Sequence, residues 1–211
     1  MKTFIIPHDP YDTGFCVFEK SAITLKPGLT VFVGCNGSGK SSLLHCIESL
    51  LKRENIPNIF FDNLKDGGQN ALSEAEYMGD LAFLATAAQS SEGENIIMNL
   101  GTFAGKVGKW VRRNRDAKEL WILLDACDSG LSIDNVIDIK KYLFQTIIND
   151  NPKSNVYILA AANEYEMASG ESCFDVVKGQ YVSFQNYEEY KTLILRSNHD
   201  KKNRKEMRST I

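Results

Sequence analysis

The residues of this chain with the clearest chemical meaning form a glycine-rich run that ends in lysine and serine. Positions 34–41 read Gly-Cys-Asn-Gly-Ser-Gly-Lys-Ser, which satisfies the pattern GxxxxGK[ST] of a phosphate-binding P-loop. Glycines allow the backbone to come close enough for its N–H groups to surround a triphosphate. Lys40 would bridge the β- and γ-phosphates of ATP, and the Ser41 hydroxyl would bind Mg²⁺. We expect phosphate contacts from Asn36, Gly37, Ser38, Gly39, Lys40, Ser41 and Ser42.

A second run supplies a carboxylate that suits the same site. Residues 121–125 read Trp-Ile-Leu-Leu-Asp, which is the pattern of a buried strand that ends in an acid. Such a strand end can hold Asp125 rigidly against the water shell of Mg²⁺, the Walker B role. The chain has no Asn-Lys-x-Asp run of the kind that reads guanine, so ATP is expected rather than GTP.

The elements that must position these residues follow from the apolar pattern. Residues 29–33 form a run of strand length that leads into the loop, and residues 41–52 read as the helix that leaves it. The N-terminus of that helix would point its dipole at the phosphates. Further strands are expected at 15–19, 23–25, 59–61, 119–125 and 156–160, helices at 73–88, 95–113 and 133–148, and a closing hairpin at 174–177 and 181–184.

Strands that alternate with helices favour an α/β fold. We expect a P-loop NTPase with a mainly parallel sheet, helices on both of its faces and an antiparallel β element near the N-terminus. A chain of 211 residues suits one domain with a sizeable core. We assign residues 1–195 to a single nucleotide-binding domain and residues 196–211 to a basic C-terminal tail.

The tail allows two interpretations. From Arg196 onward the chain holds few apolar residues and carries Lys201, Lys202, Arg204, Lys205 and Arg208. Such a stretch is either a frayed, solvated end of the chain or a basic arm that binds the phosphates of nucleic acid. The net charge of −3 provides no overall attraction to nucleic acid or to an anionic membrane.

Composition indicates the compartment. Hydrophobic residues make up 43% and charged residues 24%, as in ordinary soluble globular proteins. The five cysteines form no CxxC pair, which favours free thiols in a reducing cytoplasm over disulfides or a zinc site. No run approaches the roughly 20 apolar residues of a membrane helix. We therefore expect a cytoplasmic protein without a membrane partner.

The residues around the two motifs resemble the ABC-type ATPases. Residues 34–43 match the class pattern GxNGSGKSSL, and residues 128–132, Asp-Ser-Gly-Leu-Ser, resemble its D-loop. Within that class the chain is similar to soluble SMC/RecF-like heads and to phage-type "AAA family ATPase" proteins, over residues 15–184. The resemblance implies an ABC-ATPase-like fold, ATP and Mg²⁺ as cofactors, and a head-to-tail homodimer.

The resemblance also implies residues that complete the site. Ser91-Glu92-Gly93-Glu94 fits the short signature pattern Ser-x-Gly-[Gln/Glu], whose serine and glycine contact the γ-phosphate held by the other subunit. The same residues read as a helix capping box with Ser91 and Glu94, and both roles can hold at once. Gln69 would be the Q-loop glutamine that reaches Mg²⁺ and the attacking water.

Two positions depart from the family pattern. The glutamate that follows the Walker B aspartate in the family, and polarises water there, is Ala126 here. The loss of a general base removes a contribution of roughly 10²–10⁴-fold. Asp128 is either the nearest substitute or a D-loop residue that faces the dimer partner. Asn163 stands where the family places a γ-phosphate-sensing histidine, and it can donate a hydrogen bond but carries no charge.

Three functions are consistent with these residues. The first is a soluble ABC-type ATPase that dimerises on ATP and hydrolyses it slowly to ADP and phosphate, with DNA metabolism as its setting. The second is an ATP sensor or scaffold without turnover, which Ala126 and Asn163 favour. The third is a P-loop small-molecule kinase, against which the D-loop-like run speaks.

Overall fold

The computed structural model describes residues 1–10, 17–62, 104–129 and 131–208, and for residues 203–208 it describes the backbone alone. The strands are β1 (Lys2–Ile5), β2 (Ala22–Leu25), β3 (Gly28–Val33), β4 (Asn58–Asp62), β5 (Glu119–Asp125), β6 (Asn155–Ala161), β7 (Ser172–Asp175) and β8 (Gln180–Val182). The helices are α1 (Lys40–Arg53), α6 (Ile133–Asp138), the π-helical η1 (Ile139–Phe144), α7 (Gln145–Asn149), α8 (Tyr165–Ala168) and α9 (Tyr187–Arg208). Residues 104–113 are also helical.

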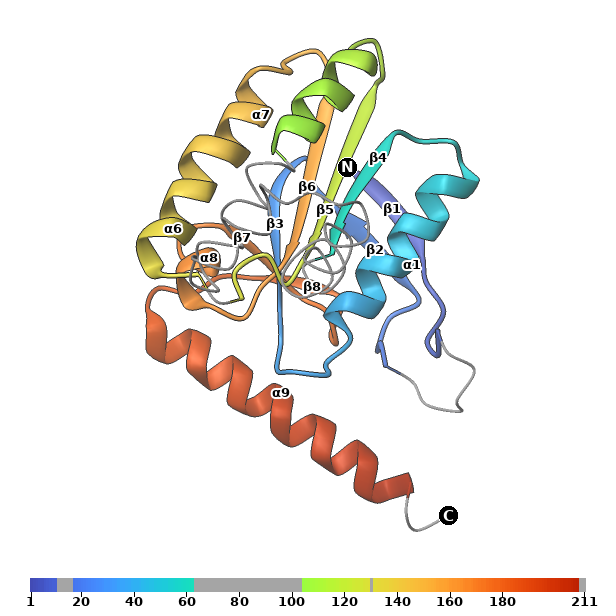
Figure 1. The fold of residues 1–211 in the computed structure, drawn as a ribbon. Helices are drawn as coiled ribbons and strands as arrows, with labels where there is room; N and C mark the ends of the chain where they lie inside the picture. The colour runs from blue at the N-terminus through green and yellow to red at the C-terminus, as the bar shows by residue number, and fades with distance from the viewer. Residues whose placement is uncertain (11–16, 63–103, 130, 209–211) are drawn as a thin grey trace, which may run out of the picture.

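Six of these strands form one mostly parallel sheet (Figure 1). Its order is β4-β5-β6-β3-β7-β8, and β1 pairs with β2 in a separate two-stranded sheet. The pairs β4–β5, β5–β6, β6–β3 and β3–β7 are parallel, whereas β7–β8 and β1–β2 are antiparallel. The predicted α/β fold, with an antiparallel N-terminal element, is confirmed.

Alternation along the strands divides the core between the two faces of the sheet. On β5, Leu120, Ile122 and Leu124 belong to one buried cluster, while Trp121 and Leu123 belong to the other. Successive side chains of a strand point to opposite faces, so a continuous apolar run requires cover on both. The apolar sequence of β5 therefore places it in the middle layer.

Different elements cover the two faces (Figure 1). The helix at 104–113, the run α6–η1–α7, α8 and α9 pack on the first face, for example through Val107, Phe144 and Tyr190. Helix α1 and the β1–β2 sheet pack on the second, for example through Leu43 and Phe4. Helix α1 is thus fixed against the sheet directly after the P-loop.

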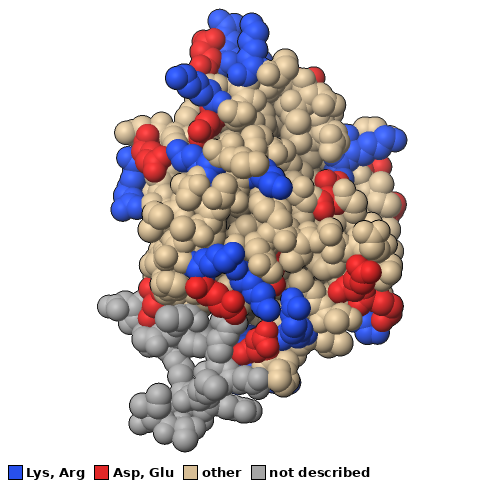
Figure 2. Space-filling model, turned by 180° about the vertical axis from the view of Figure 1, so that it is seen from behind, with Lys and Arg blue, Asp and Glu red and all other residues tan. Residues whose placement is uncertain are grey.

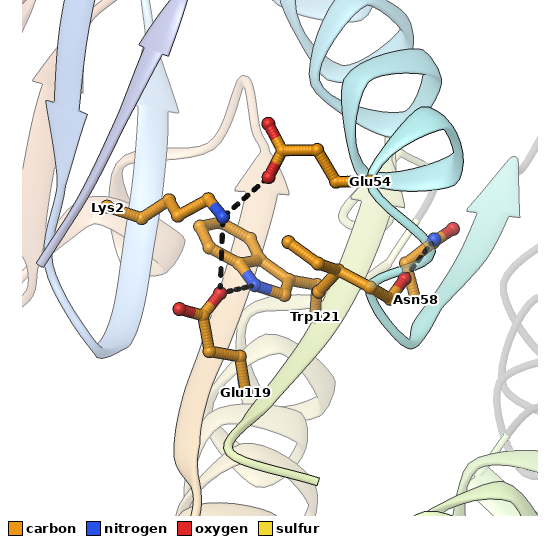
Figure 3. A network of polar contacts seen from close by, with 6 residues as sticks. Lys2, Glu54, Asn58, Glu119 and Trp121 are labelled. Atoms are coloured by element: carbon orange, nitrogen blue, oxygen red, sulfur yellow. Dashed lines mark hydrogen bonds and ion pairs between the residues drawn. The ribbon is translucent and has the colours of Figure 1, made fainter.

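A polar network ties the second layer to the start of β5 (Figure 3). The Lys2 ammonium lies 2.7 Å from a carboxylate oxygen of Glu54, which follows α1, and 3.8 Å from one of Glu119. The Trp121 indole N–H donates to that same Glu119 oxygen at 3.1 Å. The Trp121 ring stacks on Tyr157 with 3.8 Å between centroids. These contacts lie at the start of β5, so they fix the end of the strand that is opposite Asp125.

The structure differs from the expected elements at two places. Residues 17–19 form no strand, because Val17 N–H donates to the His8 carbonyl and Glu19 N–H to that of Val177. Strand β1 instead pairs with β2. The basic stretch after Arg196 is helical up to Arg208 within α9, so the expected boundary at 195 falls inside an element. The predicted helix at 73–88 lies outside the described residues.

Charges are mixed over the surface seen from behind. Figure 2 shows Lys and Arg in small groups beside Asp and Glu, without a broad basic region among the described residues of that face. Among the described helices, none is long and apolar enough to cross a membrane.

We predict that the same substitution, leucine to alanine, lowers the free energy of unfolding at a buried position much more than at an exposed one. Leu123 in β5 is fully buried, whereas Leu195 in α9 is 59% exposed. Leu123→Ala should lower the free energy of unfolding by about 2–5 kcal/mol, because it removes buried methyl groups and leaves a cavity. Leu195→Ala should change it by less than about 0.5 kcal/mol. Urea unfolding measures both, and equal losses would contradict this assignment of the core.

Candidate functional site

Four neighbouring strands bring the candidate residues to one edge of the sheet. Strand β3 leads into the P-loop, β4 ends at Asp62, β5 ends at Asp125, and β6 is followed by Asn163. Asp62 is the register partner of Asp125, and Asp125 is that of Ala161. Because the strands are parallel, their carboxyl ends meet, and ligands of open α/β sheets bind at that edge.

The backbone of the P-loop needs glycine at its turns. Gly37 has φ 71° and Gly39 has φ 99°, in the left-handed region. A Cβ on Gly39 would lie 2.5 Å from a methyl carbon of Val17, so the position has neither the conformation nor the space for a side chain. Gly39 is also the N-cap of α1, whose first turn carries no side-chain cap and no acidic residue. The first N–H groups of α1 are therefore available to an anion.

Lys40 is buried within the loop. Its side chain is 9% exposed, and its ammonium donates to the Gly34 carbonyl at 2.7 Å and to that of Cys35 at 3.4 Å. Burial lowers the pKa of Lys40, while Cys35 and the Asp128 carboxylate oppose that shift. A buried ammonium with neutral partners is costly, so a phosphate group would be a stronger partner than either carbonyl.

Ser41 and two carboxylates form an oxygen-rich corner. The Ser41 hydroxyl donates to Asp125 Oδ1 at 3.0 Å, and Asp62 and Asp125 are each 7% exposed. Burial raises the pKa of the Asp125 carboxyl, the hydrogen bond from Ser41 opposes the rise, and Asp62 adds to it. Hydroxyl and carboxylate oxygens are the ligands that Mg²⁺ prefers. Two buried acids side by side would be stabilised by a divalent cation, so the corner fits Mg²⁺.

Most of the predicted phosphate-site residues line one hollow of about 180 Å³. Ser38 does not line the hollow. It is 5% exposed, and its hydroxyl has no hydrogen-bond partner among the described residues. Gln69, Ser91 and Gly93 lie outside the described residues. The hollow is lined by Asn36, Gly37, Gly39, Lys40, Ser41, Ser42, Asp125, Ala126, Ala161 and Asn163.

Asp128 has a different surrounding from the one expected. We predicted either a substitute base or a residue that faces a partner, but its side chain is fully buried and does not line the hollow. Its Oδ2 accepts hydrogen bonds from the N–H groups of Asn163 and Glu164, both at 2.7 Å. Burial raises the pKa of this carboxyl, and the hydrogen bonds from those two N–H groups oppose the rise. In this arrangement Asp128 positions the loop that carries Asn163.

Sequence reasoning missed several residues at this edge. Asp62 ends the apolar run of β4 in the same way that Asp125 ends β5, so the pattern was present in the sequence. Tyr190, Ser197 and Lys201 reach the site from α9. The Tyr190 hydroxyl donates to the Asn163 carbonyl at 2.7 Å, and the other two contact the P-loop. No local pattern indicated these contacts, which join residues far apart in the chain.

A comparison with known families matches the part of the chain that contains the P-loop. A family model described as the AAA domain matches residues 13–81, which include the P-loop. Together with the geometry of the P-loop, this match supports a P-loop ATPase of the AAA or ABC type. The chain is also similar to a solved structure, the ADP conformation of an ATP-binding cassette of an ABC transporter. That similarity has 16% sequence identity and a TM-score of 0.41, over 80% of this chain and 84% of the other. No curated protein matches the chain.

The raised pKa of Asp125 gives the stability of the protein a testable pH dependence. An acid whose pKa is higher in the folded than in the unfolded protein stabilises the fold at low pH, and that contribution is lost as pH rises through the folded pKa. Asp125→Asn removes the titrating group. Its free energy of unfolding should therefore fall less than that of the parent between about pH 4 and about pH 8.

Urea unfolding without Mg²⁺ over that pH range measures the effect. Asp116→Asn is the matched control, because the Asp116 side chain is 95% exposed. An Asp125→Asn curve parallel to that of the parent would show that Asp125 is ionised in the fold at no cost.

Proposed function

We propose that this ATPase domain binds ATP with Mg²⁺, closes as a head-to-tail homodimer around two nucleotides, and hydrolyses ATP slowly to ADP and phosphate. One observation carries the proposal. The buried Lys40 ammonium and the Ser41–Asp125 pair lie in one hollow at the N-terminus of α1. A cation, a cation-binding pair and free helix N–H groups together suit a nucleotide triphosphate with its metal.

A second pocket beside the hollow suits the rest of the nucleotide. It has a volume of about 330 Å³, shares Ser42 with the hollow and is lined by apolar residues such as Ile5, Pro7 and Pro10. His45 also lines it and is stacked on Phe60, with 4.8 Å between centroids. We propose this pocket for the adenine and ribose. Phe18, an aromatic residue that precedes the P-loop, is 1% exposed and belongs to the core, so it is not available for that contact.

In this proposal Ser41 and Asp125 hold Mg²⁺, with Asp62 beside them. The metal supplies positive charge against the phosphates. Lys40 leaves the Gly34 carbonyl for the β- and γ-phosphates, and the N–H groups of the loop and of α1 orient them. Asn163, at the rim of the hollow, offers an uncharged hydrogen bond to the γ-phosphate.

A second copy of the chain would complete the site. Asn36, Gly37 and Ser41 are exposed at the mouth of the hollow, so a bound γ-phosphate has room for ligands from outside. We propose Ser91 and Gly93 of the partner chain for that position, as the signature pattern implies. ATP that contacts both chains favours the dimer over the monomer by mass action.

Slow hydrolysis follows from the side chains of the hollow. Ala126, which lines it, has no proton acceptor. Asp125 is the acidic residue among the described residues that line the hollow, and it accepts the hydrogen bond of Ser41. Water therefore lacks a well-placed base, which costs roughly 10²–10⁴-fold in rate. ATP would then act largely as a dimerising switch, and a sensor without turnover is the limiting case.

We predict that ATP with Mg²⁺ doubles the mass of the protein in light scattering. Lys40→Ala should abolish ATP binding and dimerisation, because the phosphates lose their buried cation. Ser91→Arg should leave ATP binding intact and block dimerisation, because a bulky side chain would occupy the contact with the partner's γ-phosphate. Titration calorimetry on the same samples separates binding from assembly.

Two matched variants control for indirect effects. Lys52→Ala removes a lysine of α1 whose side chain is 62% exposed, and Ser183→Arg enlarges an exposed serine that follows β8. Both should behave as the parent. A mass that never responds to ATP, although ATP binds, would refute the dimer and leave a monomeric nucleotide sensor.

A second prediction concerns Ala126. Ala126→Glu introduces a carboxylate at the wall of the hollow and should raise phosphate release by roughly 10²–10⁴-fold, since it supplies a general base. Ala126→Gln adds a side chain of similar size without a basic oxygen and should leave the rate low. A single-turnover phosphate assay compares the three proteins. Equal rates for the Glu and Gln variants would show that the missing base does not limit hydrolysis.

A nucleic acid remains a proposed partner on the charge of residues 196–211 alone. Those residues belong to α9 as far as Arg208, and one of them, Lys201, is directed to the P-loop. The small-molecule kinase gains no support from the described residues of the site.

A further inference from the structure

Helix α9 passes along the phosphate site and contacts it at three points. In Figure 1 it runs beneath the loop that joins β3 to α1. Near its start, the Tyr190 hydroxyl donates to the Asn163 carbonyl at 2.7 Å. Further along, Ser197 Oγ accepts from Cys35 N–H at 3.2 Å, and the Lys201 ammonium donates to the Asn36 carbonyl at 2.6 Å. Positions 190, 197 and 201 share one helix face, so this face of α9 is directed to the site.

Lys201 comes very close to the backbone of the P-loop. A Cβ placed on Gly37 would lie 2.6 Å from the Lys201 ammonium nitrogen. Asn36 and Gly37 line the phosphate hollow and are exposed, so Lys201 stands at its rim. Ser197, one turn earlier, is 9% exposed and holds this part of the helix against the loop.

Two ammonium groups, one from the P-loop and one from α9, therefore donate hydrogen bonds to neutral carbonyls of the P-loop. Lys40 bonds to Gly34 and Cys35, and Lys201 bonds to Asn36. Among the described residues, no acidic group forms an ion pair with Lys201. Like charges near each other are unfavourable, and Lys201 is one of the groups that lower the pKa of Lys40, after burial as the main cause. A polyanion at the hollow would relieve this repulsion.

The two lysines differ in position and therefore in the phosphate they can reach. Lys40 is inside the loop, and Lys201 is half-buried outside it. In the proposed binding of ATP, the loop N–H groups would enclose the inner phosphates and the terminal phosphate would lie toward the rim. Lysine is a point charge on a flexible stem, so its ammonium can exchange the Asn36 carbonyl for a phosphate oxygen. A phosphate oxygen carries a negative charge that the carbonyl oxygen lacks, so the exchange adds the attraction between opposite charges to the hydrogen bond.

We propose that Lys201, carried by α9, is a second phosphate-binding cation that contacts the terminal phosphate of ATP and so favours ATP over ADP. This inference rests on the proposed binding of ATP in the hollow. It assigns to α9 a role in distinguishing the triphosphate from the diphosphate.

The test compares affinities for ATP-Mg²⁺ and ADP-Mg²⁺ by titration calorimetry. Lys201→Ala should weaken ATP binding about tenfold or more, the usual loss for a hydrogen bond between charged groups, and should weaken ADP binding less than about threefold. Lys201→Arg keeps the charge and should stay close to the parent. Lys202→Ala is the matched control, because Lys202 is exposed next in the chain. Urea unfolding of each variant checks that the fold is retained.

Three results would overturn the inference. Equal losses for ATP and ADP would mean that Lys201 only anchors α9. Tighter ATP binding by Lys201→Ala would mean that Lys201 obstructs the site. Unchanged affinities would mean that Lys201 does not reach the phosphate. Lys40→Ala separates a failure of this inference from a failure of the proposed function. If the parent binds ATP and this variant does not, the proposed binding of ATP stands whatever Lys201 does. If the parent binds neither nucleotide, both proposals fail.

Discussion

The buried ammonium of Lys40, held by carbonyl oxygens of its own loop, is the interaction on which the rest of the structure depends. A charge at this depth is tolerable only if the backbone wraps closely around it, which requires left-handed glycines at positions 37 and 39. The wrapped loop must then be fixed at both ends. Strand β3 lies between two parallel partners, β6 and β7, and α1 buries Leu43, Leu44, Ile47 and Leu51 against the sheet. The loop is thus polar, while β3 and α1 on either side of it are packed into the core through apolar side chains.

Parallel pairing brings the remaining chemistry to the same place. Asp62 and Asp125 are register partners at the ends of β4 and β5, so two carboxylates approach each other beside Ser41. Their proximity is unfavourable unless a cation or a proton intervenes. A divalent cation there would offset the repulsion between the two carboxylates. A polyanion at Lys40 would offset the cost of burying its ammonium. A nucleotide triphosphate with its metal carries both charges, which supports the proposed binding of ATP with Mg²⁺.

The parts of the site that local sequence specifies were predictable, and the parts that depend on distant contacts were not. The P-loop and the strand that ends at Asp125 are local patterns with a fixed chemical purpose, and the fold class followed from strands that alternate with helices. The interior position of Asp128 was not predictable, because it depends on N–H groups 35 and 36 residues away in the chain. The role of α9 was hidden for a similar reason. Its basic, weakly amphipathic sequence gives no sign of a buried face, yet Ser197 is nearly buried against Cys35. Lysine, arginine and glutamate are good helix formers, which explains why the stretch is helical despite its few apolar residues.

The contacts of α9 connect two loops at the candidate nucleotide site. Asp128 holds the N–H groups of Asn163 and Glu164, the Asn163 carbonyl accepts from Tyr190, and α9 carries that connection to the P-loop through Ser197 and Lys201. Helix α9 thus joins the loop after β6 to the loop after β3. The hydrogen bonds that Lys40 and Lys201 make to loop carbonyls are both of the kind that a phosphate would replace. If Lys201 binds the terminal phosphate as proposed, α9 exchanges its hydrogen bond to the Asn36 carbonyl for one to the nucleotide, whereas the Tyr190 contact with Asn163 does not require such an exchange.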